Sequence, residues 1–157
     1  MTRLRGRSLG GTRCHDSAPG GSWTTITMIS SMRLSGATEC MVMPGATNSI
    51  SFREYVRHFL APSLKQGDTV VMDNLAAHKD RESMELIEAR GARVKFLPPY
   101  SPDLNPIEMM WSKVKEFLRN VKARTTDELI HAIKEALGSV TVENIASWVS
   151  KSGYVIM

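Results

Sequence analysis

The chain has 157 residues, about the length of one domain, and its hydrophobic (42%) and charged (23%) fractions are those of a globular protein rather than a disordered one. Lysine and arginine outnumber aspartate and glutamate by 20 to 16, a mild excess that permits a polyanionic partner. The two cysteines, Cys14 and Cys40, form no zinc or disulfide pattern, and no segment approaches a membrane helix or a signal peptide. We therefore expect a protein of the reducing cytosol with no membrane partner.

The first elements in chain order are a basic arm and a β-hairpin. Residues 1–22 hold five glycines and four arginines with little hydrophobic period, which predicts a loop or arm ahead of a folded domain over residues 23–157. From Trp23 to Met43, β-branched and apolar residues lie on both sides of a turn-like Ser35-Gly36. This pattern predicts two antiparallel strands.

A helix and a strand–helix–strand unit follow. Apolar residues recur with helical spacing at Phe52, Tyr55, Val56, Phe59 and Leu60. Ser51 and Glu54 have the spacing of a capping box at the start of this helix, and Pro62 marks its end. Thr69–Met72 is predicted to be a short buried strand, residues 80–90 a helix that Gly91 terminates, and residues 93–97 a second strand.

The remaining third of the chain is predicted to be helical. After a proline-rich segment, residues 107–118 carry an apolar stripe with basic residues on the other face, and shorter helices are expected near 126–137 and 142–150. The order of elements indicates a mixed α/β sandwich with an open sheet and a helical C-terminal end.

Two acids lie where elements end or begin. Asp73 directly follows the strand Thr69–Met72, and Glu108 is in the first turn of the next long helix. Neighbouring parallel strands would bring both to one edge of the sheet, where two carboxylates could share Mg²⁺. Local structural roles are an open alternative, because Asn105 and Glu108 also fit a capping box and Asp73-Asn74 fits a turn.

Two long runs carry a family resemblance. GDTVVMDNLAAHK (67–79) and FLPPYSPDLNPIEMMWSKVK (96–115) resemble the catalytic core of bacterial insertion-sequence transposases of the mariner-like superfamily, the DDE endonucleases. The resemblance implies a ribonuclease-H-like fold and cleavage and joining of DNA by three acids that hold two divalent metals, Mg²⁺ or Mn²⁺. It places Asp73 at the second acid and Glu108 at the third, with 34 residues between them.

Other polar residues of these runs are candidates for supporting roles. Asn74, His78 and Asn105 could assist the acids, although structural hydrogen bonds would explain them equally well. DNA contacts are considered for the basic residues near the site, Lys79, Lys113, Lys115 and Arg119, against the alternative of a solvated helix face.

The resemblance is incomplete at the front of the chain. The family's first acid ends a central strand of the sheet, and Asp16, the only acid before Glu39, lies in a loop-like context. We therefore expect the first strand of the sheet, its acid and the family's DNA-recognition helices to be missing, and the chain alone to be inactive. Three interpretations stay open: a truncated transposase, a half completed by an upstream polypeptide, and a non-catalytic DNA-binding or regulatory remnant. The open sheet edge would also permit a homo-oligomer.

Overall fold

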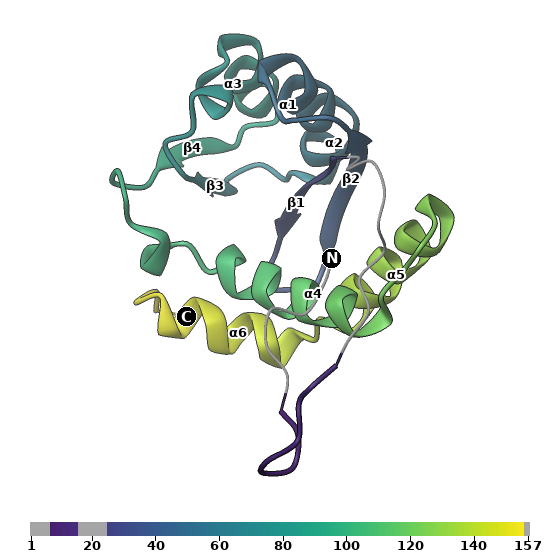
Figure 1. The fold of residues 1–157 in the computed structure, drawn as a ribbon. Helices are drawn as coiled ribbons and strands as arrows, with labels where there is room; N and C mark the ends of the chain where they lie inside the picture. The colour runs from purple at the N-terminus through teal and green to yellow at the C-terminus, as the bar shows by residue number, and fades with distance from the viewer. Residues whose placement is uncertain (1–6, 16–24, 156–157) are drawn as a thin grey trace.

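Two separate pairs of strands form the centre of the protein in the computed structural model, which describes residues 7–15 and 25–155 (Figure 1). Strands β1 (Ile26–Met32) and β2 (Thr38–Pro44) are antiparallel, and β3 (Thr69–Met72) and β4 (Arg93–Phe96) are parallel. Within the described residues no strand joins the two pairs.

Helices cover both sides of the strands. The first group consists of α1 (Ser49–Tyr55), its continuation through a π-helical turn η1 (Val56–Leu60) into α2 (Ala61–Ser63), and α3 (Arg81–Glu88). The second group consists of α4 (Ile107–Val121), α5 (Thr126–Gly138) and α6 (Val142–Lys151). Figure 1 shows the two groups on opposite sides of the strands. Short 3₁₀ turns, η2 (Ala76–Lys79) and η3 (Pro102–Leu104), lie in the connections.

Strand β1 divides the hydrophobic core into two clusters because its side chains alternate between its faces. Ile29 belongs to the cluster built on α1, η1 and α3, whereas Met28 and Met32 pack against the cluster of α4, α5 and α6. Completely buried residues anchor the two clusters: Val56 and Ile87 in the first, and Met110, Val114, Ala136 and Ile145 in the second. The result is a three-layer α/β/α arrangement.

The predicted hairpin and the predicted strand–helix–strand unit are confirmed. Gly36 has a φ of +92°, and a Cβ atom there would lie 2.9 Å from Cγ2 of Val142, so the turn between β1 and β2 requires glycine. Thr69 is in register with Arg93 and Met72 with Phe96, which makes β3 and β4 a parallel pair joined through α3.

Both capping boxes suggested by the sequence are wrong. Helix α1 begins three residues earlier, with Asn48 as its cap and Ser51 as the reciprocal partner, and Glu54 instead contacts Arg57 and His58. Helix α4 follows Pro106 and has no side-chain cap, so Glu108 is not used to start the helix.

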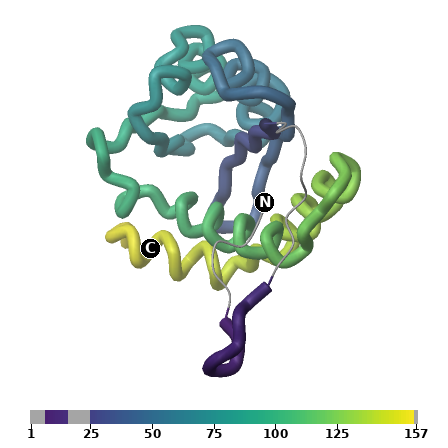
Figure 2. Tube along the Cα trace, viewed as in Figure 1, coloured from purple at the N-terminus to yellow at the C-terminus, as the bar shows by residue number. Residues whose placement is uncertain are grey.

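The predicted basic arm falls partly outside the described residues. Residues 7–15 are all exposed, and Figure 2 shows this segment as a loop that projects from the body of the molecule. The boundary between an arm over 1–22 and a domain over 23–157 stays a prediction. Among the described residues, no helix is long and apolar enough to cross a membrane.

Candidate active site

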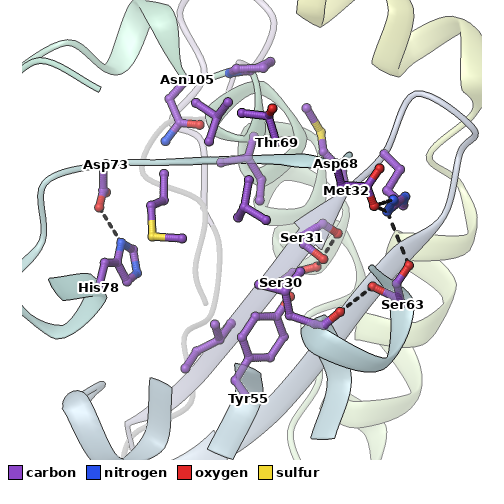
Figure 3. Close-up of a pocket in the computed structure, with 18 of the residues that line it drawn as sticks. Ser30, Ser31, Met32, Tyr55, Ser63, Asp68, Thr69, Asp73, His78 and Asn105 are labelled. Atoms are coloured by element: carbon purple, nitrogen blue, oxygen red, sulfur yellow. Dashed lines mark hydrogen bonds and ion pairs between the residues drawn. The ribbon is translucent and has the colours of Figure 1, made fainter. Parts of the chain in front are cut away.

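A cavity of about 750 Å³ lies between the two strand pairs and contains the predicted acids. Residues of β1 and β3 form its walls, and the start of α4 closes one side. Asp73, His78, Asn105 and Glu108 all contribute to its lining. Figure 3 shows Asp73, His78 and Asn105 in this cavity, with Asp68 at the opposite end of β3 from Asp73. Both candidate acids therefore line the same cavity.

Asp73 is held in a tight turn directly after β3. Its Oδ1 atom accepts a hydrogen bond from the backbone N–H of Leu75 at 3.1 Å, so the turn suggested by the sequence is present. The side chain is half exposed. The turn holds Oδ1, and Oδ2 has no hydrogen-bond or ion-pair partner in the described part of the chain, so the turn and a metal-binding role are compatible.

Asn74 links the ends of the two parallel strands. Its Nδ2 atom donates to the carbonyl oxygen of Leu97, and the backbone N–H of Leu97 donates to the carbonyl oxygen of Met72. This bridge fixes the strand end that carries Asp73 against the start of the proline-rich segment. The contact supports the structural interpretation of Asn74.

His78 lies beside Asp73 on η2. Its Nδ1 atom is 2.7 Å from Oδ1 of Asp73, close enough for an ion pair, although the ring is not oriented for a linear hydrogen bond. The imidazole packs against Phe52, with ring centroids 4.5 Å apart, and its side chain is 19% exposed. A histidine so enclosed can restrict the rotation of Asp73.

Helix α1 anchors the segment that carries His78. Arg53, next to Phe52, donates two hydrogen bonds to Asp80 at 2.9 and 2.6 Å. Asp80 also caps α3 by accepting from Ser83. The Arg53 guanidinium, assisted by Ser83, holds the pKa of the Asp80 carboxyl well below its ordinary value. Two adjacent residues of α1 therefore hold the loop between β3 and α3, Phe52 through His78 and Arg53 through Asp80.

Glu108 is exposed in the first turn of α4. The N-terminal end of a helix favours a carboxylate there, because the free N–H groups give it a partial positive charge. No hydrogen bond or ion pair of the Glu108 carboxylate is found within residues 25–155. Glu108 lines the cavity, and within these residues its carboxylate serves no structural contact.

A hydrogen bond from Tyr154, far along the chain, holds the proline-rich segment before Glu108 in place. The hydroxyl of Tyr154 donates to the carbonyl oxygen of Leu104 at 2.8 Å, across 50 residues of sequence. Desolvation raises the pKa of Tyr154 further above neutral pH. Asn105 lines the cavity beside this contact. Tyr154 thus helps to fix where α4 begins.

The basic candidates occupy different environments. Lys113 is turned inward, where its Nζ atom donates to the carbonyl oxygen of Ser139 and to Oδ1 of Asn144 at 2.6 Å. Lys79 and Lys115 are exposed, and Arg119 is half-buried. Lys113 therefore joins α4 to the start of α6, and Lys79 and Lys115 are the most exposed of the four candidates.

Sequence patterns did not indicate Phe52, Arg53, Asp80 or Tyr154 as parts of the site. Phe52 was read as a core residue, and the contacts of the other three join positions too far apart in sequence to give a periodic signal. The Asp80-x-x-Ser83 spacing is a helix-cap pattern that could have identified Asp80 as the end of the loop.

The donor set fits a divalent cation in part. Carboxylate oxygens at a strand end and a helix start are the ligands that Mg²⁺ or Mn²⁺ prefers. Within residues 7–15 and 25–155, however, no three side chains of the metal-binding types are grouped closely enough to hold an ion. The site offers two carboxylates and a histidine that already contacts one of them.

Comparison with known families identifies the class of protein. Residues 1–130 match the family described as DDE superfamily endonuclease. The chain therefore belongs to the DDE superfamily endonucleases, and its mixed α/β structure is consistent with their ribonuclease-H-like fold. No curated protein matches the chain.

Proposed function

We propose that the chain is the catalytic part of a bacterial insertion-sequence transposase of the mariner-like superfamily, which cuts and rejoins DNA in the cytosol. Membership in the DDE endonucleases supports DNA cleavage in general. The finer assignment rests on the two sequence runs, 67–79 and 96–115, which contain Asp73 and Glu108.

Asp73 and Glu108 are proposed as the metal ligands. Two divalent metal ions, when bound, would activate the attacking oxygen and stabilise the leaving oxygen of a phosphodiester. The chain's own contribution is to place two carboxylates on one cavity, one at the end of β3 and one at the start of α4. The single observation that carries the proposal is that both acids line this cavity while Glu108 is free of any capping bond.

A third acidic ligand is required, and the described residues do not supply it. Two carboxylates leave a pair of dications with too little negative charge and too few bridging oxygens. We therefore propose that residues 1–157 alone have little or no nuclease activity and that an additional segment supplies the third acid.

A non-catalytic DNA-binding role is the second candidate. The exposed Lys115 lies on α4, the helix that carries Glu108, and Arg119 follows it one turn later. These charges could hold a phosphate backbone whether or not the metal site is complete.

Nicking of supercoiled plasmid in Mn²⁺ tests the two candidates. The chain of residues 1–157 is expected to be inactive, whereas a longer polypeptide that adds an upstream strand ending in an acid is expected to nick. Asp73→Asn and Glu108→Gln should each abolish that activity. If the longer polypeptide also fails to nick but binds DNA in a salt-sensitive way that survives both substitutions, the DNA-binding role replaces the catalytic one.

A further inference from the structure

Tyr100, in the loop between β4 and η3, has a backbone and a surface exposure that the fold does not explain. Its φ is +56°, in the left-handed region where glycine is favoured and a bulky side chain is strained. The residue is also completely exposed, so no packing within the described part of the chain offsets that strain. Strained backbone that the fold does not need is found most often where a protein binds something else.

The loop that carries Tyr100 has a fixed backbone. At its start, Leu97 N donates to Met72 O at 2.8 Å, and at its end Leu104 O accepts from the Tyr154 hydroxyl at 2.8 Å. Figure 1 shows the segment between β4 and α4 at the edge of the molecule. An aromatic ring presented by a rigid loop loses little conformational freedom on binding. Three prolines restrict the backbone between the two contacts: Pro98, Pro99 and Pro102.

Strand β4, which leads into this loop, presents two cations on its open face. Val94 and Phe96 pack against the core cluster of α1, η1 and α3, so the alternation of the strand places Arg93 and Lys95 on the opposite face. Both cations are exposed, and within residues 7–15 and 25–155 neither side chain has an ion pair or a hydrogen bond. They lie about 6.6 Å apart along the strand, a spacing that successive phosphates of an extended nucleic acid strand can match.

The same face of β3 leads to the candidate acid. Thr69 is in register with Arg93, and Val71 with Lys95, so these four side chains share one face of the parallel pair. Val71 is 37% exposed in the middle of it. The four positions carry two positive charges and no negative one before Asp73, which directly follows β3. A polyanion that lies along β4 would therefore run towards the end of the sheet that carries Asp73.

An exposed aromatic ring beside free cations fits an unpaired nucleic acid strand better than a duplex. Arginine and lysine bind phosphates, and an aromatic ring stacks on the face of a base whatever its sequence. Inside a duplex each base is already stacked on its neighbours, so its face is not available to a single ring.

We propose that Arg93, Lys95 and Tyr100, the β4–Tyr100 surface, bind an unpaired DNA strand. Both cations contact phosphates, and the tyrosine ring stacks on a base. The choice of DNA rests on the proposed function. The stacking itself needs neither a metal ion nor a third acid, so it is present in the chain of residues 1–157.

Two fluorescein-labelled oligonucleotides test the surface by fluorescence anisotropy with residues 1–157, at low salt and in EDTA. One is a thymidine strand, and the other has the same length with abasic sites in place of its bases. Because both keep their phosphates, phosphate contacts alone would bind them equally. We expect the thymidine strand to bind about tenfold more tightly. Equal binding of the two strands, or no binding of either, would overturn the proposal.

Variants of Tyr100 show whether its ring causes the preference for bases. Tyr100→Leu should remove the preference and Tyr100→Phe should retain it, because only an aromatic ring stacks on a base. Tyr100→Gly should also remove it and leave Tm at or above that of wild type, since glycine tolerates a positive φ. A preference that survives in Tyr100→Leu, or a lower Tm in Tyr100→Gly, would contradict a tyrosine kept for binding.

Variants of the two cations measure the phosphate contacts. Arg93→Met and Lys95→Met should each reduce the salt dependence of binding by about 0.7 units of slope and keep the preference for the thymidine strand. Lys134→Met, at an exposed position of α5, is the matched control and should bind as wild type. An unchanged slope in both β4 variants would remove the strand from this face and overturn the proposal.

The absence of metal from these titrations separates the proposal from the proposed function. If the chain prefers the thymidine strand but the longer polypeptide fails to nick in Mn²⁺, the surface is retained and the catalytic role is contradicted. If the longer polypeptide nicks but neither protein distinguishes the two strands, the catalytic role is retained and the β4–Tyr100 surface is overturned.

Discussion

The imidazole of His78 restrains the carboxylate of Asp73: Nδ1 of the histidine lies 2.7 Å from Oδ1 of the aspartate, and Phe52 packs on the ring. The Leu75 N–H also contacts Oδ1, so within the described residues the contacts of this carboxylate leave Oδ2 available. A metal ligand whose orientation is fixed in advance loses less conformational freedom on binding.

His78→Phe should therefore weaken Mn²⁺ binding at Asp73 while preserving the fold. Phenylalanine keeps the ring packing on Phe52 and removes the nitrogen that contacts Asp73. We expect a several-fold loss of Mn²⁺ affinity, measured by electron paramagnetic resonance, with little change in Tm. His78→Ala should lower both, because it also removes the ring packing. Unchanged Mn²⁺ affinity in both variants would show that His78 does not position Asp73.

The ion pair between Arg53 and Asp80 should make the stability of the protein depend on pH. Its two hydrogen bonds join charged groups whose side chains are only 25% and 10% exposed, so Arg53→Met should lower the free energy of unfolding at pH 7. The comparison of urea unfolding for the two proteins measures this decrease.

The pH dependence has a defined sign. Asp80 has a lower pKa in the folded protein than in the unfolded chain, so its stabilising effect is complete above the unfolded value of about 3.9 and is lost as the pH falls below it. The difference between wild type and Arg53→Met should accordingly shrink between pH 5 and pH 2.5, within the approximate range that the linkage predicts. A difference that stays constant over this range would contradict a charged partner for Arg53.

Two neighbouring lysines of α4 should have different functions. Lys113→Met removes the hydrogen bonds to Ser139 and Asn144 and should lower stability by about 1 to 3 kcal/mol. Lys115→Met, at an exposed position, should leave Tm unchanged and reduce the salt dependence of DNA binding by about one unit of slope. Thermal melts and binding titrations at several salt concentrations distinguish the two. Loss of DNA binding in Lys113→Met without a change in Tm would reverse these roles.

Local patterns were sufficient to predict most of the elements. Thr69–Met72 was predicted with the bounds that the structure has, because a short apolar run between a turn and a polar residue has few alternatives. The hairpin around Gly36 and the helix that ends before Gly91 followed from glycines that adopt positive φ. The rule that parallel strands end at the same edge predicts one site for Asp73 and Glu108, and both residues line one cavity in the structure.

The incorrect predictions involve patterns that several structures satisfy. Asn48-x-x-Ser51 and Ser51-x-x-Glu54 are both capping signals, and the structure has the first. Lys113 was grouped with the exposed basic face, although the carbonyl groups at the end of α5 draw it inward. The ion pair between Arg53 and Asp80 depends on the packing of α1 against α3, and no periodic pattern in the sequence predicts that packing. The gap between the strand pairs could be expected only from the family resemblance.

A shared metal site at Asp73 and Glu108 is tested most directly by Mn²⁺ titration followed by electron paramagnetic resonance. Wild type should bind weakly, with two carboxylates at the site. Asp73→Asn and Glu108→Gln should each weaken binding by about tenfold or more, and the double variant should lose little beyond either single one, because both acids serve the same ion. Asp103→Asn, at an exposed acid in η3, is the matched control and should bind as wild type. Wild-type Mn²⁺ affinity in either single variant would contradict a metal site shared by these two carboxylates.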